Sequence, residues 1–542
     1  MSKFTSPQDN EWEQQLKIPP QVGNSGVGDA HLRPVNLFWS NVFKIFEDNV
    51  VSLTKSDLSS AFQYIEKSKQ KGGSNTKENL LSKAYISDEL LNEIKSKHKK
   101  VFDMLPEGLS SATYKEGTTG VVLIGGSKFS WLSYLSLLAL RRSGSKLPVE
   151  IIMPTFKDYQ KELDFCTKTL PALDASCVVV PDILGPSVML NWQSKFANYQ
   201  FKSLALVTCS FQNVLMLDSD NILIDNPDEI FQSKLYQDYG MITWPDYWER
   251  TISPSFYDIA GVKVNEKKRV RYNRFPLNVP LTEDPNLNDE EVESVPYHDL
   301  DGAVPNLSTE SGQLVVNKAT HGKTLLLSLY YNIYGPNLFY KFFSLGEMGE
   351  GDKDTFPAAA IVAKQKYYHV KSYIQTFGYI NSGGNFQGVS MGQKNPLKDF
   401  ELFEEKVVTP GYNNDKKPLN DQIEDLKKLL SETFHNRNEV PLFAIHCNYP
   451  KLDPKEFMNR EDLYDPENDR LKYKLFNGLT YQKAPTAIDG QGEVNFELEQ
   501  WSAIHKTVCD DKIEFVHFKD VDHSKMCEFI KNQVKWLSLK DN

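Results

Sequence analysis

The stretch that decides the fold is NVLMLDSDNILIDNPDEIF, residues 213–231, in which an apolar run ends on two aspartates. The run at 214–217 predicts a buried strand, and open α/β sheets bind ligands at the carboxyl ends of such strands. If the chain turns after Asp218, then Asp218 and Asp220 can reach one cation, and hard oxygen ligands suit Mg²⁺ or Mn²⁺. The alternative is that DSDN only forms an Asx turn or a helix cap.

Strand and helix patterns alternate on the amino-terminal side of this motif. Apolar strands are predicted at 120–126 and 147–154, and helices at 129–144 and 158–171. Further strands are predicted at 177–182 and 203–210, and after the motif at 311–317, 441–450 and 512–521. This alternation predicts an α/β fold with a mostly parallel central sheet. It also disfavours a phosphatase of the haloacid-dehalogenase type, whose D-x-D opens the domain.

Composition excludes several classes of protein. The chain has 542 residues with 61 Lys and Arg against 72 Asp and Glu, a net charge of −11, so a nucleic-acid partner is not expected. Its six cysteines form no CxxC pair, which argues against a zinc cluster. The amino terminus has no signal-peptide core, and no uninterrupted apolar run is long enough for a membrane span.

The predicted organisation has two parts. Residues 1–115 form a flexible leader and a helical stem, and residues 116–542 form the catalytic domain. Within that domain we expect a nucleotide-binding half at 116–261, a charged insertion at 262–307, an acceptor and catalytic half at 308–455, and a carboxyl-terminal extension at 456–542. The insertion pairs a basic block at 263–274 with an acidic block at 281–300.

Two further motifs could bind a nucleotide sugar with the aspartates. Gly125 and Gly126 lie between a strand and a helix, where glycines allow close backbone approach and a helix start favours anions; a plain tight turn is equally compatible. In AIHCNYPKLDP, His446 could complete the metal shell and Lys451 could neutralise a diphosphate, although a lone His is more often a packing residue. The predicted donor-binding residues are Gly125, Gly126, Lys128, Trp131, Asp218 and Lys451, and the metal ligands are Asp218, Asp220 and His446.

Acidic and aromatic residues elsewhere suggest contacts with sugars. Glu310, Asp352 and Asp354 could act where an oxocarbenium-like centre develops, although a helix cap also suits Asp354. Trp and Tyr side chains can stack on sugar faces, but they can equally form a packing cluster. The predicted acceptor-binding residues are Trp244, Asp246, Trp248, Arg250 and Gln313.

Seven blocks in chain order resemble the fungal α-mannosyltransferases of glycosyltransferase family 71, especially the α-1,2 enzymes that branch outer-chain mannan. The blocks are GSKLPVEIIMP, VLMLDSDN, WPDYWERT, ESGQLVVNK, LYYNIYGP, GEGDKDTF and HCNYPKLDP. The resemblance implies a GT-A fold, GDP-mannose as donor, Mn²⁺ (or Mg²⁺) as metal, and a mannose-terminated glycoprotein glycan as acceptor. It also implies the Golgi lumen, where family members are held by an amino-terminal anchor that this sequence does not show.

The same resemblance implies that configuration is retained, because donor and product are both α-linked. Front-face substitution is the first expectation, and a covalent intermediate on an acid such as Asp352 is the second. Two other functions stay open on the sequence. One is a GT-A transferase that uses a UDP-sugar, because D-x-D does not report the base. The other is an inactive glycan-binding homologue.

Overall fold

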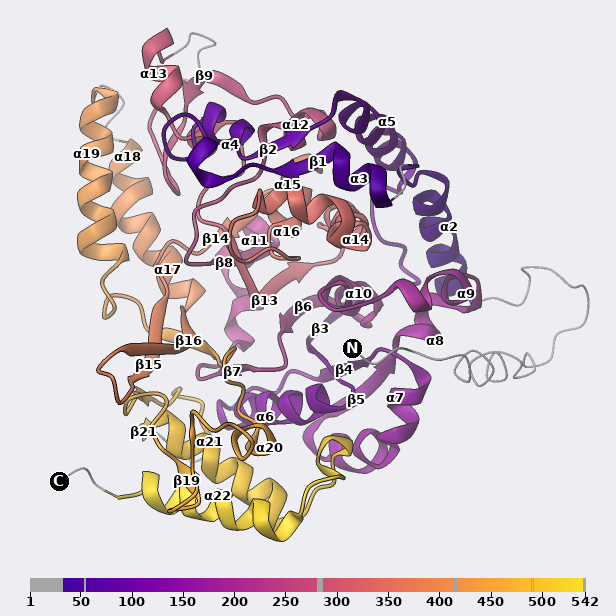
Figure 1. Cartoon of the computed structure of the whole chain (residues 1–542), viewed down its shortest axis with the longest axis vertical. Coiled ribbons are helices and arrows are strands. Elements are labelled where there is room, and N and C mark those ends of the chain that lie inside the picture. Colours follow the sequence, from indigo (N-terminus) through magenta and orange to yellow (C-terminus); the bar gives the residue numbers. More distant parts are fainter. Residues whose placement is uncertain are drawn as a thin grey trace, which may run out of the picture.

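The computed structural model describes residues 33–52, 55–279, 286–412, 417–488, 490 and 492–539. Residues 1–32, where the flexible leader is expected, therefore lie outside the described residues. Figure 1 shows the chain as a central sheet with helices around it. No helix among the described residues is long and apolar enough to cross a membrane.

The central sheet has seven strands in the order β14-β8-β13-β6-β3-β4-β5. Neighbours pair in parallel everywhere except on the two sides of β13, which is antiparallel to β6 and to β8. The prediction of an α/β fold with a mostly parallel central sheet is confirmed. The strands are β3 (Lys115–Ile124), β4 (Val149–Met153), β5 (Ala175–Val179), β6 (Phe211–Leu217), β8 (Met241–Pro245), β13 (Thr309–Asn317) and β14 (Tyr368–His369).

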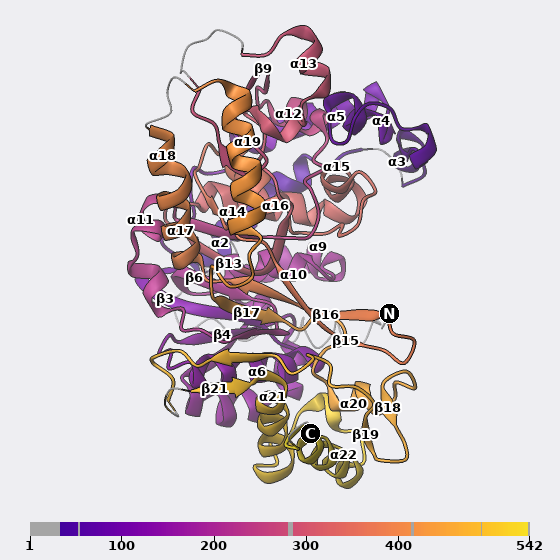
Figure 2. The same cartoon turned by 90° about the vertical axis from the view of Figure 1, so that its left-hand side faces the viewer.

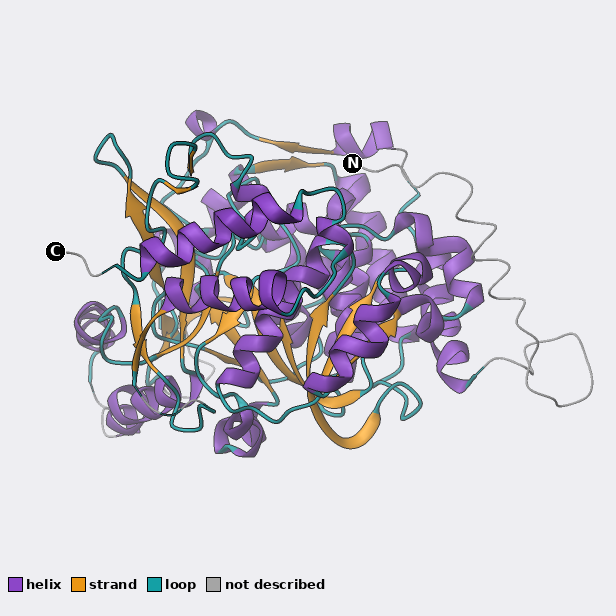
Figure 3. Cartoon of the chain, turned by 90° about the horizontal axis from the view of Figure 1, so that it is seen from below, coloured by secondary structure: helices purple, strands orange, loops and turns teal. Residues whose placement is uncertain are grey.

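Both faces of this sheet are buried, which explains why its strands are apolar without alternation. Along β6, Val214 and Met216 belong to one hydrophobic cluster, while Leu215 and Leu217 belong to the other. Helices cover the strands from both sides when the molecule is seen from below (Figure 3). The first cluster includes α10 (Gln200–Thr208) and α14 (Gly322–Ile333); the second includes α6 (Lys128–Arg142), α21 (Phe496–His505) and α22 (His523–Leu537).

Two predicted strands are absent and must be corrected. Residues 203–210 fall mostly in helix α10, because an apolar run alone does not distinguish a strand from a buried helix. Residues 512–521 contain only the short 3₁₀ turn Val516–Phe518. There Phe515 and Phe518 both turn to the same indole, that of Trp131, instead of alternating across a strand.

A second sheet of four antiparallel strands brings distant segments to the D-x-D motif. It runs β15 (Gln375–Ile380), β16 (Phe386–Lys394), β17 (Leu442–His446) and β7 (Asn221–Leu223). β7 starts directly after Asp220, and its first residue Asn221 pairs with His446 at the end of β17. This register carries His446 to the aspartates although it lies far from them in sequence.

The amino-terminal helices pack onto the catalytic core. Trp39 and Phe46 of α2 (Pro34–Asp48) are fully buried and share a hydrophobic cluster with α10. α5 (Asp88–Met104) contributes Ile94 and Val101 to that cluster. A stem boundary near residue 115 stays a prediction.

Within the predicted insertion, the two charge blocks pair with each other. Lys267 lies 3.0 Å from Asp289, and Arg269 lies 2.6 Å from Asp299. β9 (Asn265–Arg269) carries both cations, and the first anion opens α13 (Asp289–Ser294). The two charge blocks therefore link β9 to the segment 289–299. Residues 280–285 between the blocks lie outside the described part of the chain.

Candidate active site

The turn at 218–220 is fixed by hydrogen bonds on every side. The Asp218 N–H donates to Gly312 O at 2.8 Å, and the Cys447 N–H donates to Asp220 O at 2.9 Å. The Ser136 hydroxyl, from α6, donates to Ser219 O at 2.8 Å. The Asn221 N–H closes the turn onto Asp218 O at 3.0 Å, so both carboxylates face the same space at the end of β6.

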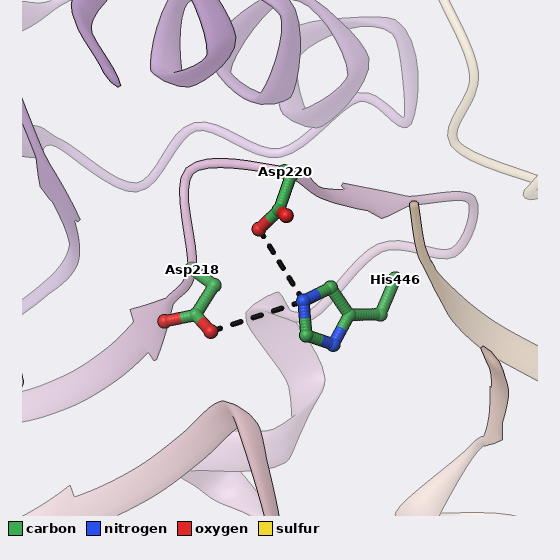
Figure 4. Close-up of side chains that lie close together, drawn as sticks. All are labelled: Asp218, Asp220 and His446. Atoms are coloured by element: carbon green, nitrogen blue, oxygen red, sulfur yellow. Dashed lines mark ion pairs between the residues drawn. The ribbon is translucent and has the colours of Figure 1, made fainter. Parts of the chain in front are cut away.

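Asp218, Asp220 and His446 come together there as a possible metal-binding group. One ligand atom from each lies within 4.8 Å of the others. Figure 4 shows the His446 ring directed at both carboxylates, with Nε2 3.3 Å from Asp220 Oδ1 and 3.8 Å from Asp218 Oδ2. Two carboxylate oxygens and one imidazole nitrogen form a set of donors that suits Mn²⁺.

Glu310 of β13 orients the imidazole. Its Oε1 lies 3.0 Å from His446 Nδ1, and its Oε2 accepts from Gln313 Nε2 at 2.7 Å. A carboxylate behind a ligating histidine fixes the tautomer and the ring orientation. Gly312 leaves room for this contact, because a Cβ there would lie 2.5 Å from Glu310 Oε1 and 2.6 Å from His446 Nδ1.

Lys202 is a site residue that the sequence reasoning missed. From α10, its ammonium lies 3.0 Å from Asp218 Oδ2 and 3.5 Å from Asp352 Oδ2, and it donates to Ser311 Oγ at 2.8 Å. The Ser311 hydroxyl also donates to Asp352 Oδ2, at 3.1 Å. The available signal was a lone lysine in an apolar helix, which was obscured when 203–210 was predicted as a strand.

Burial and neighbouring charges act against each other on these acids. Burial raises the pKa of Asp218 to about 6, against the opposing charge of Lys202. For Glu310 the charge of His446 outweighs burial and lowers the pKa to about 2. For Asp220, burial is outweighed by His446 and by Lys451, which forms an ion pair with it, and the pKa is lowered.

The candidate metal-binding group opens into a cavity of about 920 Å³. This cavity is large enough for a nucleotide sugar. Its lining includes Gly125, Gly126 and Ser127 at the end of β3, and residues 349–353. Of the predicted site residues, the cavity brings together Gly125, Gly126, Asp218, Asp220, Asp246, Glu310, Asp352, His446 and Lys451.

The first glycine of the pair is required by packing. A Cβ on Gly125 would lie 2.6 Å from Met153 Sδ and 2.7 Å from Ile151 Cγ2, both on β4. Gly126 adopts a φ of 98°, in the left-handed region that favours glycine. The pair therefore lets β3 turn into α6 close against the sheet, which leaves the start of α6 at the cavity.

Several predicted residues lie outside the cavity lining. Trp131 is fully buried, donates to Leu452 O at 3.0 Å and packs on Phe518, so its indole is not available to a donor. Lys128, at the start of α6, is also not part of the lining. Trp244 is fully buried and stacks on Phe443, as the packing alternative expected.

Arg250, Gln313 and Asp354 are buried supports behind the cavity. Arg250 is fully buried and lies 2.6 Å from Asp354 Oδ1. Asp354 precedes α16 (Thr355–Val362) but makes no side-chain cap; it accepts from the Thr309 N–H at 3.0 Å instead. Gln313 Nε2 donates to Glu310 Oε2. Trp248, in contrast, is 45% exposed and lies beside Gly349, outside the cavity lining. None of Arg250, Gln313 and Asp354 is part of the cavity lining, so a direct contact of these residues with sugar stays a prediction.

Comparison with known proteins gives the family. Residues 118–395 match a family model described as "Mannosyltransferase putative". The chain is 53% identical to the α-1,2-mannosyltransferase MNN23 of Candida albicans over 98% of this chain and 91% of that protein. It is 33% identical to the α-1,2-mannosyltransferase MNN2 of Saccharomyces cerevisiae over 96% of this chain and 87% of that protein.

Solved structures add little. Mouse xyloside xylosyltransferase 1 matches with 14% identity over 46% of this chain and 85% of that chain, at a TM-score of 0.27, which is too low to bear on the fold. The family follows instead from sequence identity to the relatives over nearly the whole length of the chain. The chain belongs to the fungal α-1,2-mannosyltransferase family and is a glycosyltransferase.

Proposed function

We propose that this chain transfers mannose from GDP-mannose to a mannose hydroxyl of a glycoprotein glycan, with Mn²⁺ bound and with retention of configuration. The proposed product is an α-1,2 branch on outer-chain mannan, the linkage in the names of the relatives. The observation that carries this proposal is the convergence of Asp218, Asp220 and His446 on one space at the edge of the sheet, inside a cavity that can hold a nucleotide sugar.

The residues present fit a divalent metal. Asp218 and Asp220 offer carboxylate oxygens, His446 offers an imidazole nitrogen, and Glu310 holds the ring from behind. When bound, Mn²⁺ would act as a Lewis acid that neutralises charge on the departing diphosphate. Lys451, which lines the cavity beside Asp220, supplies a second positive charge at the same place.

The lining suggests how the donor lies. The glycine turn at 125–126 and the start of α6 would face the nucleoside and phosphates, because a glycine-rich strand-to-helix turn allows close approach. Asp352 and Lys202, which also line the cavity, would then face the mannose. The acceptor would enter beside Asp246, which also lines the cavity and is paired with Lys353 at 2.6 Å.

Asp352 is the proposed catalytic carboxylate. It is buried, and Lys202 and Ser311 hold it on one side, so it is fixed before the donor binds. A fixed anion there would stabilise positive charge that develops at the anomeric carbon. Front-face substitution, with the leaving phosphate assisting the acceptor hydroxyl, is the proposed route, and covalent attack by Asp352 is the second route.

The proposed location is the Golgi lumen, where glycoprotein mannan is extended. Cys166–Cys177 and Cys509–Cys527 form disulfides. Disulfides persist in oxidising compartments and are rare in the cytosol. These bonds support a place in the secretory pathway.

The test is a transfer assay with an α-mannoside acceptor and either GDP-mannose, UDP-galactose or UDP-glucose, each in Mn²⁺ and in EDTA. The expected result is an α-linked mannoside, identified by NMR, from GDP-mannose in Mn²⁺ alone. Transfer from a UDP-sugar would overturn the proposed donor, and unchanged transfer in EDTA would overturn the proposed metal. Absence of turnover by the folded protein would favour a glycan-binding homologue.

A further inference from the structure

A cluster of three tyrosines, one exposed and two half-buried, lies beside the segment that carries His446 and has no part in the site described above. His446, Asn448 and Lys451 all line the cavity, but Tyr449 between them is 64% exposed. Its N–H donates to Val389 O of β16 at 3.4 Å. The segment that supplies a predicted metal ligand therefore also presents an aromatic ring outside the cavity.

Tyr449 is supported from one side by charged residues. The Arg460 guanidinium lies 4.9 Å from the centre of the Tyr449 ring. Arg460 Nε in turn donates to Asp462 Oδ1 at 3.0 Å. A cation on one face of an aromatic ring holds the ring in place, and the exposed fraction of Tyr449 shows that much of the side chain stays open to solvent.

A second tyrosine pair continues this surface. Tyr379 of β15 and Tyr473 stack with ring centres 4.6 Å apart and planes at 20°. The Ser382 N–H donates to the Tyr473 hydroxyl at 3.2 Å, which ties the turn of the β15–β16 hairpin to the segment after β19 (Arg470–Leu471). Tyr379 is also close enough to Tyr449 and Arg460 for these two side chains to influence the pKa of its hydroxyl. Figure 2 shows the hairpin reaching alongside β18 (Tyr464–Asp465) and β19.

We propose that these residues form an acceptor platform that binds the sugars of an extended α-mannan chain beyond the one that reacts. The platform consists of Tyr379, Tyr449, Arg460, Asp462 and Tyr473. This inference rests on the proposed function, since it names where the acceptor of that same site extends.

The chemistry of the platform favours a carbohydrate. Pyranose rings present C–H faces that pack on aromatic rings and hydroxyls that bind charged side chains, and the platform offers both within one cluster. Its continuity with the cavity is direct, because Met391 of β16 lines the cavity and pairs with His446. A chain that leaves the cavity along β16 would therefore meet Tyr449 first.

The test compares acceptors of different length. In Tyr449→Ala the KM for a long α-linked oligomannoside should rise about tenfold, the loss of roughly one aromatic contact. The KM for α-methyl mannoside and the KM for GDP-mannose should stay unchanged. Tyr449→Phe keeps the ring and should behave as the wild type. The matched control is Tyr85→Ala, whose side chain is 54% exposed on β2 (Ala84–Ile86).

Three results would overturn the platform: no change in any KM, an equal rise for long and short acceptors, or a changed KM for GDP-mannose. Arg460→Ala provides a second variant that leaves the loop at 446–451 intact. It should raise only the KM for the long acceptor, by less than Tyr449→Ala does. Metal-dependent hydrolysis of GDP-mannose by the wild type, measured without acceptor, shows separately whether the proposed donor chemistry holds.

Discussion

Lys202 Nζ lies 3.0 Å from Asp218 Oδ2, so a buried cation from α10 is paired with a predicted metal ligand at the end of β6. The same ammonium reaches Asp352, the proposed catalytic carboxylate, at 3.5 Å. Lys202 thus connects the proposed metal ligand Asp218 to Asp352, in the part of the cavity that would hold the sugar. Both carboxylates depend on it for charge compensation when no metal is bound.

Lys202→Met should reveal this dual role. Loss of one partner of a buried ion pair costs about 3–5 kcal/mol, so the melting temperature in EDTA should fall clearly. Mn²⁺ should bind the variant more tightly than the wild type in the absence of nucleotide, because a competing cation is gone. The turnover number should fall about a hundredfold, because Asp352 loses its support.

Lys202→Arg keeps the charge and is the control. It should retain Mn²⁺ affinity near the wild-type value, measured by calorimetry. Equal or weaker Mn²⁺ binding in Lys202→Met would show that Lys202 does not compete with the metal.

Glu310→Gln tests the orientation of His446. The variant keeps the size of the side chain but loses the charge that accepts from His446 Nδ1. Loss of such a partner typically weakens metal binding about 10- to 100-fold. Mn²⁺ titration in the presence of GDP measures this effect, and circular dichroism should show an unchanged fold. Wild-type affinity would remove Glu310 from the site.

Gly312→Ala tests the same contact by crowding. The added methyl would lie 2.5 Å from Glu310 Oε1 and 2.6 Å from His446 Nδ1. We expect transfer to be nearly abolished, since the imidazole and the carboxylate cannot both stay in place. Gly108→Ala is the matched control, because nothing lies within 4 Å of a Cβ at that position, and its activity should equal that of the wild type. Full activity of Gly312→Ala would contradict the described geometry.

Asp352→Asn and Asp354→Asn form a matched pair with opposite expectations. Asp352→Asn should abolish transfer while GDP still binds in Mn²⁺, because the lost charge is the one proposed to face the sugar. Asp354→Asn should instead lower the free energy of unfolding by about 3–5 kcal/mol, because it removes the negative charge that is paired with the fully buried Arg250. Denaturant unfolding measures the stability of each variant, and initial rates of transfer measure its activity. A stable Asp354→Asn that has lost activity would restore a direct role for Asp354.

Sequence patterns predicted the parts of this molecule that depend on local order. The apolar strand before Asp218 and the strand–helix alternation were enough for the α/β fold, because buried parallel strands read as apolar runs. The same rule failed at 203–210, where an equally apolar run is helix α10. Periodicity cannot separate these two outcomes in a short segment.

The residues that line the site depend on pairing between distant segments, and this limits prediction from sequence. His446 was predicted by its residue type, but its position depends on the register between β17 and β7. Arg250 and Trp244 carry the chemistry expected of sugar contacts, yet both are fully buried, as an ion-pair partner and a packing residue. Lys202 was missed because a lone lysine in an apolar segment does not reveal its partners, Asp218 directly after β6 and Asp352 before α16.

The most direct measurement is calorimetric titration of GDP into the wild type and into Asp220→Ala, each in Mn²⁺ and in EDTA, with UDP and ADP alongside. The account predicts that GDP binds the wild type only in Mn²⁺, more tightly than UDP or ADP. It also predicts that Asp220→Ala, with its fold unchanged, does not bind GDP in either condition. Equal GDP affinity for the variant and the wild type in Mn²⁺ would contradict the assignment of Asp218, Asp220 and His446 as the metal site.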